Sequence, residues 1–239
     1  MTRPRVICHM TTSVDGRIVT SGWPDSGGGG EYEAVHASYA ADGWLCGRVT
    51  MEPFAGGVRA DVDVAREHEE PAGGPREDFV APGAAAEDVG FAFALDPSGR
   101  LAWASNDIAG DHVVALLAAR VSDDYLAFLR ARGVSYLIAG DREVDLALAL
   151  EKIGARFGVR TLLLEGGGRI NGGMLAAGLI DELSVLVAPV ADGRVGTPAL
   201  FDGDAMTPHR LALEAVERRA GDTLWLRYRV EHGAADGPG

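Results

Sequence analysis

The segment 161–174, Thr-Leu-Leu-Leu-Glu-Gly-Gly-Gly-Arg-Ile-Asn-Gly-Gly-Met, most constrains the fold of this chain. An apolar stretch suited to a buried strand ends at Glu165, and three glycines lead into a short predicted helix over about 170–177. Glycine has no Cβ, so a phosphate can approach the main chain closely, and the start of a helix favours an anion. The junction therefore predicts a pyrophosphate cradle. The alternative is a tight strand-to-helix turn that binds nothing.

The order of the remaining predicted elements indicates an α/β fold. Strands are predicted at 6–10, 44–47, 91–95, 112–116, 135–139 and 161–164, and helices at 31–41, 50–54, 123–132, 146–157 and 170–177. The last third instead predicts strands at 183–190, 211–218 and 223–230. Strand–helix units followed by strands alone predict a mostly parallel central sheet with antiparallel C-terminal edge strands.

No internal repeat or clear linker divides the chain, so we predict a single domain over 1–232. Within it, the segment 56–90 is rich in Gly, Pro, Ala and acidic residues and has no period, which predicts a long surface excursion. Residues 233–239 read as a disordered tail.

Composition excludes several classes of function. A formal charge of −13 argues against a nucleic-acid partner and against an anionic membrane surface. No signal peptide is recognisable and no apolar run reaches the roughly 18 residues of a membrane span, so we expect a cytoplasmic protein. Cys8 and Cys46 lie in separate apolar runs, which predicts buried free thiols and no metal site.

Three further turns follow predicted strands, at 13–17 (Ser-Val-Asp-Gly-Arg), 47–50 (Gly-Arg-Val-Thr) and 96–100 (Asp-Pro-Ser-Gly-Arg). Each contains groups that can contact a ligand, although ordinary turn chemistry explains each one taken alone. Glu165 stands at the carboxyl end of its strand, the edge where open α/β sheets bind ligands. Its carboxylate could accept N–H groups of a substrate or take part in proton transfer, or it could merely cap the helix.

Taken together, these segments resemble the C-terminal reductase domain of the riboflavin-pathway RibD enzymes and related pyrimidine reductases. The resemblance covers about residues 5–230 and implies a dihydrofolate-reductase-like, three-layer fold. It also implies a homodimer and hydride transfer from NADPH to a C=N or C=O bond of a small heterocyclic or ribosylamine-like substrate. A dihydrofolate or pteridine reductase, and a non-catalytic module that binds NADPH, are the alternatives.

The resemblance also implies roles for single residues. Glu165 would face the substrate, and Asp15 would influence the proton that accompanies the hydride. Thr11 and Thr12 would lie by the nicotinamide, and Ser98 would lie near the 2′-phosphate. The other expected cofactor contacts are Gly47, Arg48 and Thr50 on the adenosine side, and Gly166, Gly167, Gly168, Arg169 and Ile170 at the pyrophosphate.

The chain departs from the family pattern in two places. RibD reductases usually carry an arginine on the helix before the second strand and an Asp-Asp-Pro segment after that strand. Here the helix reads His36-Ala-Ser-Tyr-Ala, and the later segment reads Glu52-Pro-Phe-Ala-Gly-Gly. The zinc-binding motif of the RibD deaminase half is absent from the sequence. The cofactor is therefore predicted more firmly than the substrate.

Overall fold

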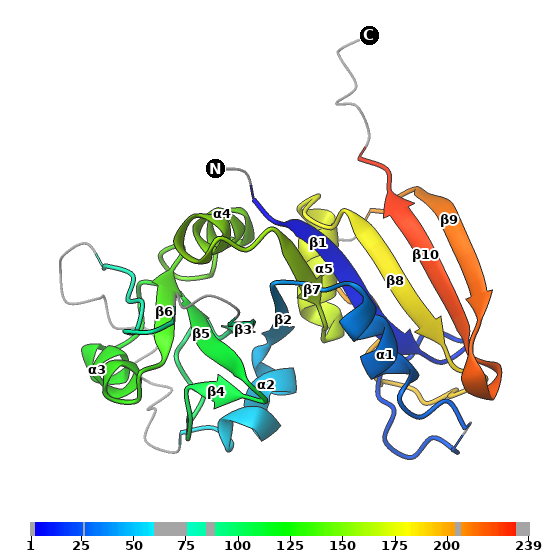
Figure 1. Ribbon diagram of the computed structural model, residues 1–239, viewed down its shortest axis with the longest axis horizontal. Coiled ribbons are helices and arrows are strands. Elements are labelled where there is room, and N and C mark those ends of the chain that lie inside the picture. The colour runs from blue at the N-terminus through cyan, green and yellow to red at the C-terminus, as the bar shows by residue number, and fades with distance from the viewer. Residues whose placement is uncertain (1–2, 26, 60–75, 85–88, 204–206, 233–239) are drawn as a thin grey trace, which may run out of the picture. The chain divides into compact units, whose positions relative to one another are not determined.

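The computed structural model describes residues 3–25, 27–59, 76–84, 89–203 and 207–232 (Figure 1). The chain divides into two compact units: unit 1 contains residues 1–4 and 42–162, and unit 2 contains residues 5–41 and 163–239. Among the described residues, every helix is too short or too polar to cross a membrane.

Unit 1 combines a mainly parallel group of strands with three helices. Its strands are β2 (Gly43–Gly47), β3 (Phe91–Leu95), β4 (Asp107–Ile108), β5 (Asp111–Leu117) and β6 (Ser135–Ile138). Their order is β4-β5-β3-β2, with β6 also paired to β5, and only the β4–β5 pair is antiparallel. The helices are α2 (Arg48–Ala55), α3 (Asp123–Ala131) and α4 (Leu146–Phe157).

Aromatic packing fixes α4 against the sheet of unit 1. Phe157, at the end of α4, lies 5.0 Å from Phe91 and 5.9 Å from Phe93 between ring centroids. Phe91 and Phe93 are two positions apart on β3, so they share one face of the strand. The helix starts where Asp145 accepts the N–H of Leu148, and it ends at a left-handed glycine. The predicted bounds 146–157 are confirmed.

Unit 2 contains the antiparallel strands at the C-terminal end of the chain. Its strands are β1 (Arg5–Thr12), β8 (Glu182–Val187), β9 (Leu211–Arg218) and β10 (Leu224–Val230), together with β7 (Thr161–Leu164), whose last two residues belong to this unit. The order is β7-β1-β8-β10-β9. β1 and β8 are parallel, whereas β10 is antiparallel to both β8 and β9. The predicted mixture of parallel and antiparallel strands is confirmed.

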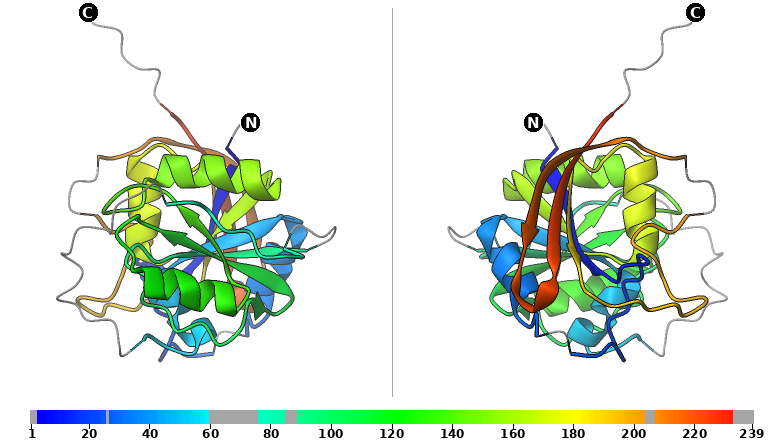
Figure 2. Two further views of the ribbon diagram at one scale, coloured as in Figure 1. Left: turned by 90° about the vertical axis from the view of Figure 1, so that its left-hand side faces the viewer. Right: turned by 90° about the vertical axis from the view of Figure 1, so that its right-hand side faces the viewer.

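Two helices cover the strands of unit 2 from opposite sides, α1 (Glu31–Ser38) on one face and α5 (Gly168–Ala176) on the other (Figure 2). Alternation along β1 explains this arrangement. His9 stacks on Tyr32 of α1, with ring centroids 4.4 Å apart. The next residue, Met10, points the other way and meets Gly166, just before α5.

The structure corrects two predicted features. β8 ends at Val187 rather than at residue 190, because Pro189 interrupts the strand and Val190 donates its N–H to the Ala188 carbonyl. The two-residue strand β4 was missed because its sequence has no strand pattern.

Part of the segment predicted as a surface excursion belongs to the packed structure. Phe79 pairs with Tyr136 of β6, and both Ala81 and Ala84 are buried. Short apolar residues among glycines carry no periodic signal, so their burial was not readable from the sequence. Residues 60–75 and 85–88 of this segment, and the predicted tail 233–239, lie outside the described residues.

Candidate active site

Unit 2 brings together the predicted residues that follow β1 and β7. Thr11 and Thr12 form the end of β1, and Glu165 directly follows β7, the neighbouring strand. Gly166 has a φ of +94° and packs so closely that a Cβ there would lie 2.9 Å from Cε of Met10. Only glycine adopts this backbone readily at such a distance. The peptide bond between Gly166 and Gly167 is cis.

Glu165 is enclosed and contacts a histidine. Its side chain is 11% exposed, and its Oε1 lies 2.7 Å from Nδ1 of His36, which is 37% exposed. The negative charge of Glu165 also acts on β1. Burial raises the pKa of the Cys8 thiol far above its usual range, and the Glu165 charge raises it further. Cys8 is therefore an uncharged free thiol, as predicted from the sequence.

His9 is the second histidine near Glu165, and it is held neutral. Burial lowers its pKa, although the Glu165 carboxylate acts in the opposite direction. Its Nε2 lies 3.3 Å from the Tyr32 carbonyl oxygen, and its Nδ1 lies 3.0 Å from the Ser184 hydroxyl oxygen and 3.3 Å from the Ser184 carbonyl oxygen. The Ser184 hydroxyl oxygen in turn accepts the indole N–H of Trp225. This chain of hydrogen bonds joins β1, β8, β10 and α1.

Two glycines of α5 are needed for packing, whether or not a ligand binds there. A Cβ on Gly168 would overlap the Ala199 carbonyl oxygen, and a Cβ on Gly172 would overlap the Asp202 carbonyl oxygen. The Asp202 N–H donates to the Gly168 carbonyl at 3.0 Å. The segment 199–202 thus occupies the Cβ side of Gly168. A phosphate contact at this turn, including Gly168, stays a prediction.

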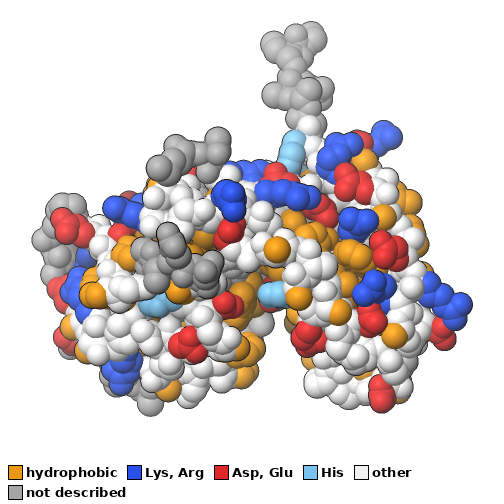
Figure 3. All heavy atoms as spheres, viewed as in Figure 1, with side chains coloured by type: hydrophobic (Ala, Val, Ile, Leu, Met, Phe, Trp, Pro, Cys, Tyr) orange, Lys and Arg blue, Asp and Glu red, His pale blue; other side chains and the backbone are white. Residues whose placement is uncertain are grey.

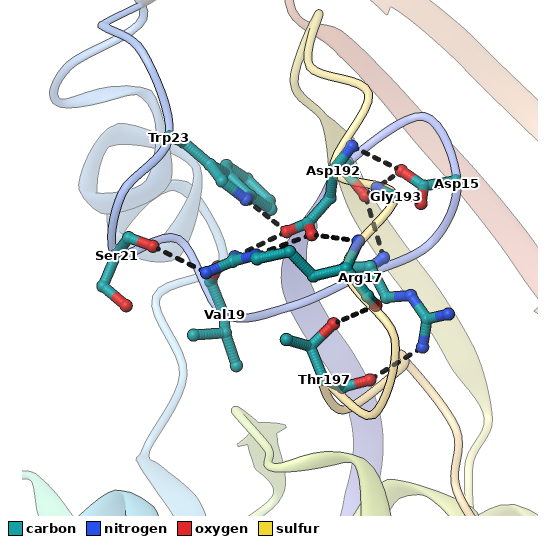
Figure 4. A network of polar contacts seen from close by, with 10 residues as sticks. Asp15, Arg17, Val19, Ser21, Trp23, Asp192, Gly193 and Thr197 are labelled. Carbon is teal, nitrogen blue, oxygen red and sulfur yellow. Dashed lines mark hydrogen bonds and ion pairs between the residues drawn. The ribbon is translucent and has the colours of Figure 1, made fainter.

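Asp15 holds two loops together. One carboxylate oxygen accepts the Asp192 N–H at 2.9 Å and the other accepts the Gly193 N–H at 3.0 Å (Figure 4). The Ser13 hydroxyl adds a third donor. These donors lower the pKa of Asp15 to about 2, with the Asp192 N–H contributing most. The contacts favour a role in holding the loops, and a role in proton transfer stays a prediction.

Arg194 extends the same connection. Its guanidinium donates to both carboxylate oxygens of Asp192 and to the Val19 and Ser21 carbonyls, while the Trp23 indole also donates to Asp192 (Figure 4). We call this set of contacts between residues 13–23 and 192–197 the loop clamp. It fixes the chain that follows β1 against the chain that follows β8.

Unit 1 holds the other predicted cofactor residues. Gly47 and Leu95 are paired at the ends of the parallel strands β2 and β3, so the turns after them share an edge. Arg48 begins α2 and forms an ion pair with Glu52 one turn later. Its charge also reaches the buried Asp96, where it opposes the rise in pKa that burial causes.

The turn that contains Ser98 is organised by Asp96. One carboxylate oxygen of Asp96 accepts the N–H groups of Arg100 and Leu101 at 2.6 and 2.9 Å. The predicted turn at 96–100 is thereby confirmed, with Ser98 half-buried within it. Thr50 is likewise half-buried, on the first turns of α2. The structure places Gly47, Arg48, Thr50 and Ser98 in unit 1, and the other predicted site residues in unit 2.

Sequence reasoning missed two sets of residues. His36 stands where an arginine is usual in the family, and its contact with Glu165 joins residues 129 positions apart, so no local pattern predicts it. The Asp192–Arg194 part of the loop clamp was also missed. The only local signal was the turn-forming Asp-Gly pair at 192–193, which predicts a turn but names no partner.

Comparison with known proteins identifies the family. The model of the RibD C-terminal domain matches residues 4–225. A 2,5-diamino-6-ribosylamino-4(3H)-pyrimidinone 5′-phosphate reductase of Methanothermobacter thermautotrophicus is 36% identical over 109 residues, which is 44% of this chain and 50% of the relative. The enzyme of the same name from Archaeoglobus fulgidus is 31% identical over 81 residues, 34% of this chain and 36% of the relative. The matched part thus spans half or less of these curated relatives.

Solved structures show the same fold. A pyrimidine reductase-like protein from Corynebacterium diphtheriae superposes with a TM-score of 0.68 at 19% identity, covering 96% of this chain and 93% of that one. The riboflavin biosynthesis reductase Rib7 of Saccharomyces cerevisiae superposes with a TM-score of 0.60 at 16% identity, covering 96% and 90%. The fold is therefore the dihydrofolate-reductase-like α/β fold of these reductases. With a family match that runs from residue 4 to residue 225, this chain belongs to the RibD C-terminal domain family.

Proposed function

We propose that this protein is an NADPH-dependent reductase of a phosphorylated ribosylaminopyrimidine, the type of compound named for its relatives. The observation that carries the proposal is the position of Glu165. Its enclosed carboxylate stands between the end of β7 and the start of α5, in a chain of this family. A carboxylate in such a place can orient a heterocycle by accepting its N–H groups.

The start of α5 fits a nicotinamide dinucleotide. The first backbone N–H groups of a helix point outward from its start and favour phosphate oxygens, and the first turn of α5 contains no acidic residue. We assign the nicotinamide to Thr11 and Thr12, and the 2′-phosphate to Ser98. The adenosine side is assigned to Gly47, Arg48 and Thr50. The pyrophosphate is assigned to Gly166, Gly167, Gly168, Arg169 and Ile170. At Gly168 the contact would come from the backbone, because the segment 199–202 covers the Cβ side.

The cofactor would supply the hydride, and the residues of the chain would orient the substrate. Glu165 is the group that we assign to the substrate, and the loop clamp would hold Thr11, Thr12 and the chain beyond them in place. The ring-closed ribosylamine gains a C=N bond when its C1′–O4′ bond opens and O4′ takes a proton. Reduction then adds the hydride to C1′ and a proton to nitrogen, so the product is the ribitylamino compound. We place this activity in the cytoplasm, in one reductase domain over residues 1–232.

The test is an assay of NADPH oxidation with 2,5-diamino-6-ribosylamino-4(3H)-pyrimidinone 5′-phosphate and, in parallel, with dihydrofolate. We expect turnover of the pyrimidine alone. Glu165→Gln should lower kcat about 100-fold, and its affinity for NADPH should stay within about 2-fold, because the amide keeps the shape of the side chain. Glu151→Gln, at an exposed position of α4, is the matched control.

Three outcomes would contradict the proposal. Turnover of dihydrofolate at a comparable rate would make the protein a pteridine reductase. NADPH binding without turnover of either compound would make it a non-catalytic module. Equal losses of turnover and of NADPH affinity in Glu165→Gln would assign the carboxylate a structural role.

We further propose that the protein is a homodimer built on β9 and β10. Leu213, Val216 and Leu224 are 57%, 54% and 41% exposed. Val216 pairs with Leu226, and Leu213 pairs with Tyr228, so these apolar side chains share one face. The sequence predicted that the Leu224 side of β10 would be half-buried, and a second copy of the strand pair would cover it.

The opposite face of the same strands is charged. Arg227 and Arg229 lie near Glu217 and Glu214, and in Figure 3 positive and negative side chains alternate over this face. Light scattering of Val216→Asp should show a monomer, whereas Val195→Asp, at a 98% exposed loop residue, should leave a dimer. A wild-type monomer would refute the proposal.

A further inference from the structure

The contact between His36 and Glu165 supports an inference about how substrate binding is controlled. Nδ1 of His36 lies 2.7 Å from Oε1 of Glu165. His36 lies in the last turn of α1, and Glu165 follows β7, so the contact connects two elements that flank β1. The 37% exposed imidazole can exchange protons with water, whereas the 11% exposed carboxylate is largely shielded from it.

We propose that His36 is a positioning residue that donates its Nδ1–H to Glu165 and so orients the carboxylate to accept an N–H group of the substrate. This proposal rests on the proposed function, because it needs Glu165 to face the substrate. It names the chemistry that the site selects, a heterocycle that presents a hydrogen-bond donor to a carboxylate.

The position of the proton on His36 matters because of the geometry. An imidazolium carries a proton on both ring nitrogens, so its Nδ1–H must face Oε1. A neutral imidazole donates in the same way when its proton is on Nδ1, whereas a proton on Nε2 would leave the Nδ1 lone pair against the carboxylate, which is repulsive. The carboxylate therefore favours the forms of His36 that have a proton on Nδ1, and these forms hold the Glu165 side chain in place.

Two other titratable groups near Glu165 lie on β1. Burial keeps Cys8 as a thiol and His9 as a neutral imidazole. His9 already contacts the Tyr32 carbonyl and the Ser184 hydroxyl. His36, by contrast, lies at hydrogen-bond distance from a carboxylate oxygen of Glu165.

Three variants separate positioning from simple packing. His36→Ala removes the donor, and we expect kcat/KM for the pyrimidine to fall by about 10-fold to 100-fold. His36→Asn keeps an N–H donor near the position of Nδ1 but does not titrate, so kcat/KM should return to within about 3-fold of wild type. His232→Ala is the matched control, because His232 lies 3.9 Å from Asp181 in another histidine–carboxylate pair.

Recovery of activity in His36→Asn is the readout that packing alone would not give, because this variant restores the N–H donor and not the imidazole ring. His232→Ala should match the wild type. Failure of His36→Asn to recover activity in a protein that folds normally would overturn the proposal.

A second measurement does not depend on turnover. Nitrogen NMR of the His36 ring should show that it titrates at lower pH in Glu165→Gln than in the wild type, because the partner charge is gone. An unchanged titration would refute the coupling. If the coupling is present but neither the diaminopyrimidinone nor 5-amino-6-(5-phosphoribosylamino)uracil is reduced, then the proposed function fails while the coupling of the two side chains stands.

Discussion

The indole N–H of Trp23 donates to Oδ2 of Asp192 at 2.6 Å, which joins residues 169 positions apart. The Asp192 side chain is fully enclosed, and Arg194 donates to both of its oxygens. The loop clamp therefore depends on a shielded carboxylate, whose hydrogen bonds are stronger than those of an exposed ion pair.

Asp192→Asn should open the loop clamp locally. The amide offers one acceptor oxygen in place of two, so the hydrogen bonds from Trp23 and from both sides of Arg194 cannot all persist. We expect faster amide hydrogen exchange across residues 17–23 and 190–197, with little change in α4. The matched control is Asp222→Asn, because Asp222 also pairs with an arginine but is 69% exposed. Equal effects of the two variants would show that enclosure of Asp192 adds nothing.

Asp15 should make stability depend on acid pH. Its pKa in the folded protein is about 2, below the ordinary value of an aspartate, because the Asp192 and Gly193 N–H groups and the Ser13 hydroxyl donate to it. The ionised carboxylate therefore stabilises the folded state above about pH 4, and this contribution disappears as pH falls toward 2.

The variant Asp15→Asn should accordingly have a lower Tm than the wild type at pH 6, and the difference should shrink between about pH 4 and pH 2. Thermal unfolding followed by circular dichroism across this range is the measurement. Asp141→Asn, at an exposed position outside the loop clamp, should not reproduce the change. A difference in Tm that grows on acidification would contradict the argument.

The fold was predictable because its signals are local. The spacing of Leu146, Leu150, Ile153 and Phe157 defined α4, and the run from Thr161 to Glu165 defined β7 and the turn after it. The predicted site residues came partly from such turns and partly from the resemblance to a family. The structure supports the turns, whereas the cofactor and substrate contacts of these residues remain predictions.

The contacts that the sequence did not reveal are all non-local. Glu165 and His36, or Trp23 and Asp192, meet only after the strands between them have paired. A single sequence contains no signal for such pairs, because each residue alone has an ordinary local explanation. The same holds for Gly168 and Gly172, whose missing side chains suit a phosphate as well as they suit the segment 199–202.

Gly172→Ala should destabilise the protein although it lies inside a helix. Alanine in place of glycine normally stabilises a helix by about 1 kcal/mol. Here the added Cβ would overlap the backbone of Asp202, and overpacking of this kind costs about 1–3 kcal/mol. We expect a net fall in Tm of a few degrees. Gly29→Ala, where a Cβ would meet nothing within 4 Å, should be nearly neutral. A stabilised Gly172→Ala protein would mean that the segment 199–202 moves away without cost.

Arg48 should determine the preference for NADPH over NADH. Arg48 is paired with Glu52 through an ordinary contact between residues one helical turn apart, which contributes only a few tenths of a kcal/mol. A 2′-phosphate carries more charge than a carboxylate and offers three acceptor oxygens, so it can compete with Glu52 for the guanidinium. Binding of NADPH would then break only the weak contact between Arg48 and Glu52, so little binding free energy would be lost.

Titration with each cofactor tests this assignment. Arg48→Gln should weaken NADPH binding about 10-fold and leave NADH binding within about 2-fold, because only NADPH carries the extra phosphate. Glu52→Gln should keep or slightly improve NADPH affinity, since it removes the competing carboxylate. Arg218→Gln, which also breaks an arginine–carboxylate pair four residues apart, should change neither affinity. If NADPH and NADH bind equally well to the wild type, Arg48 and Ser98 do not contact a 2′-phosphate, and the adenosine side of the cofactor must be assigned to other residues.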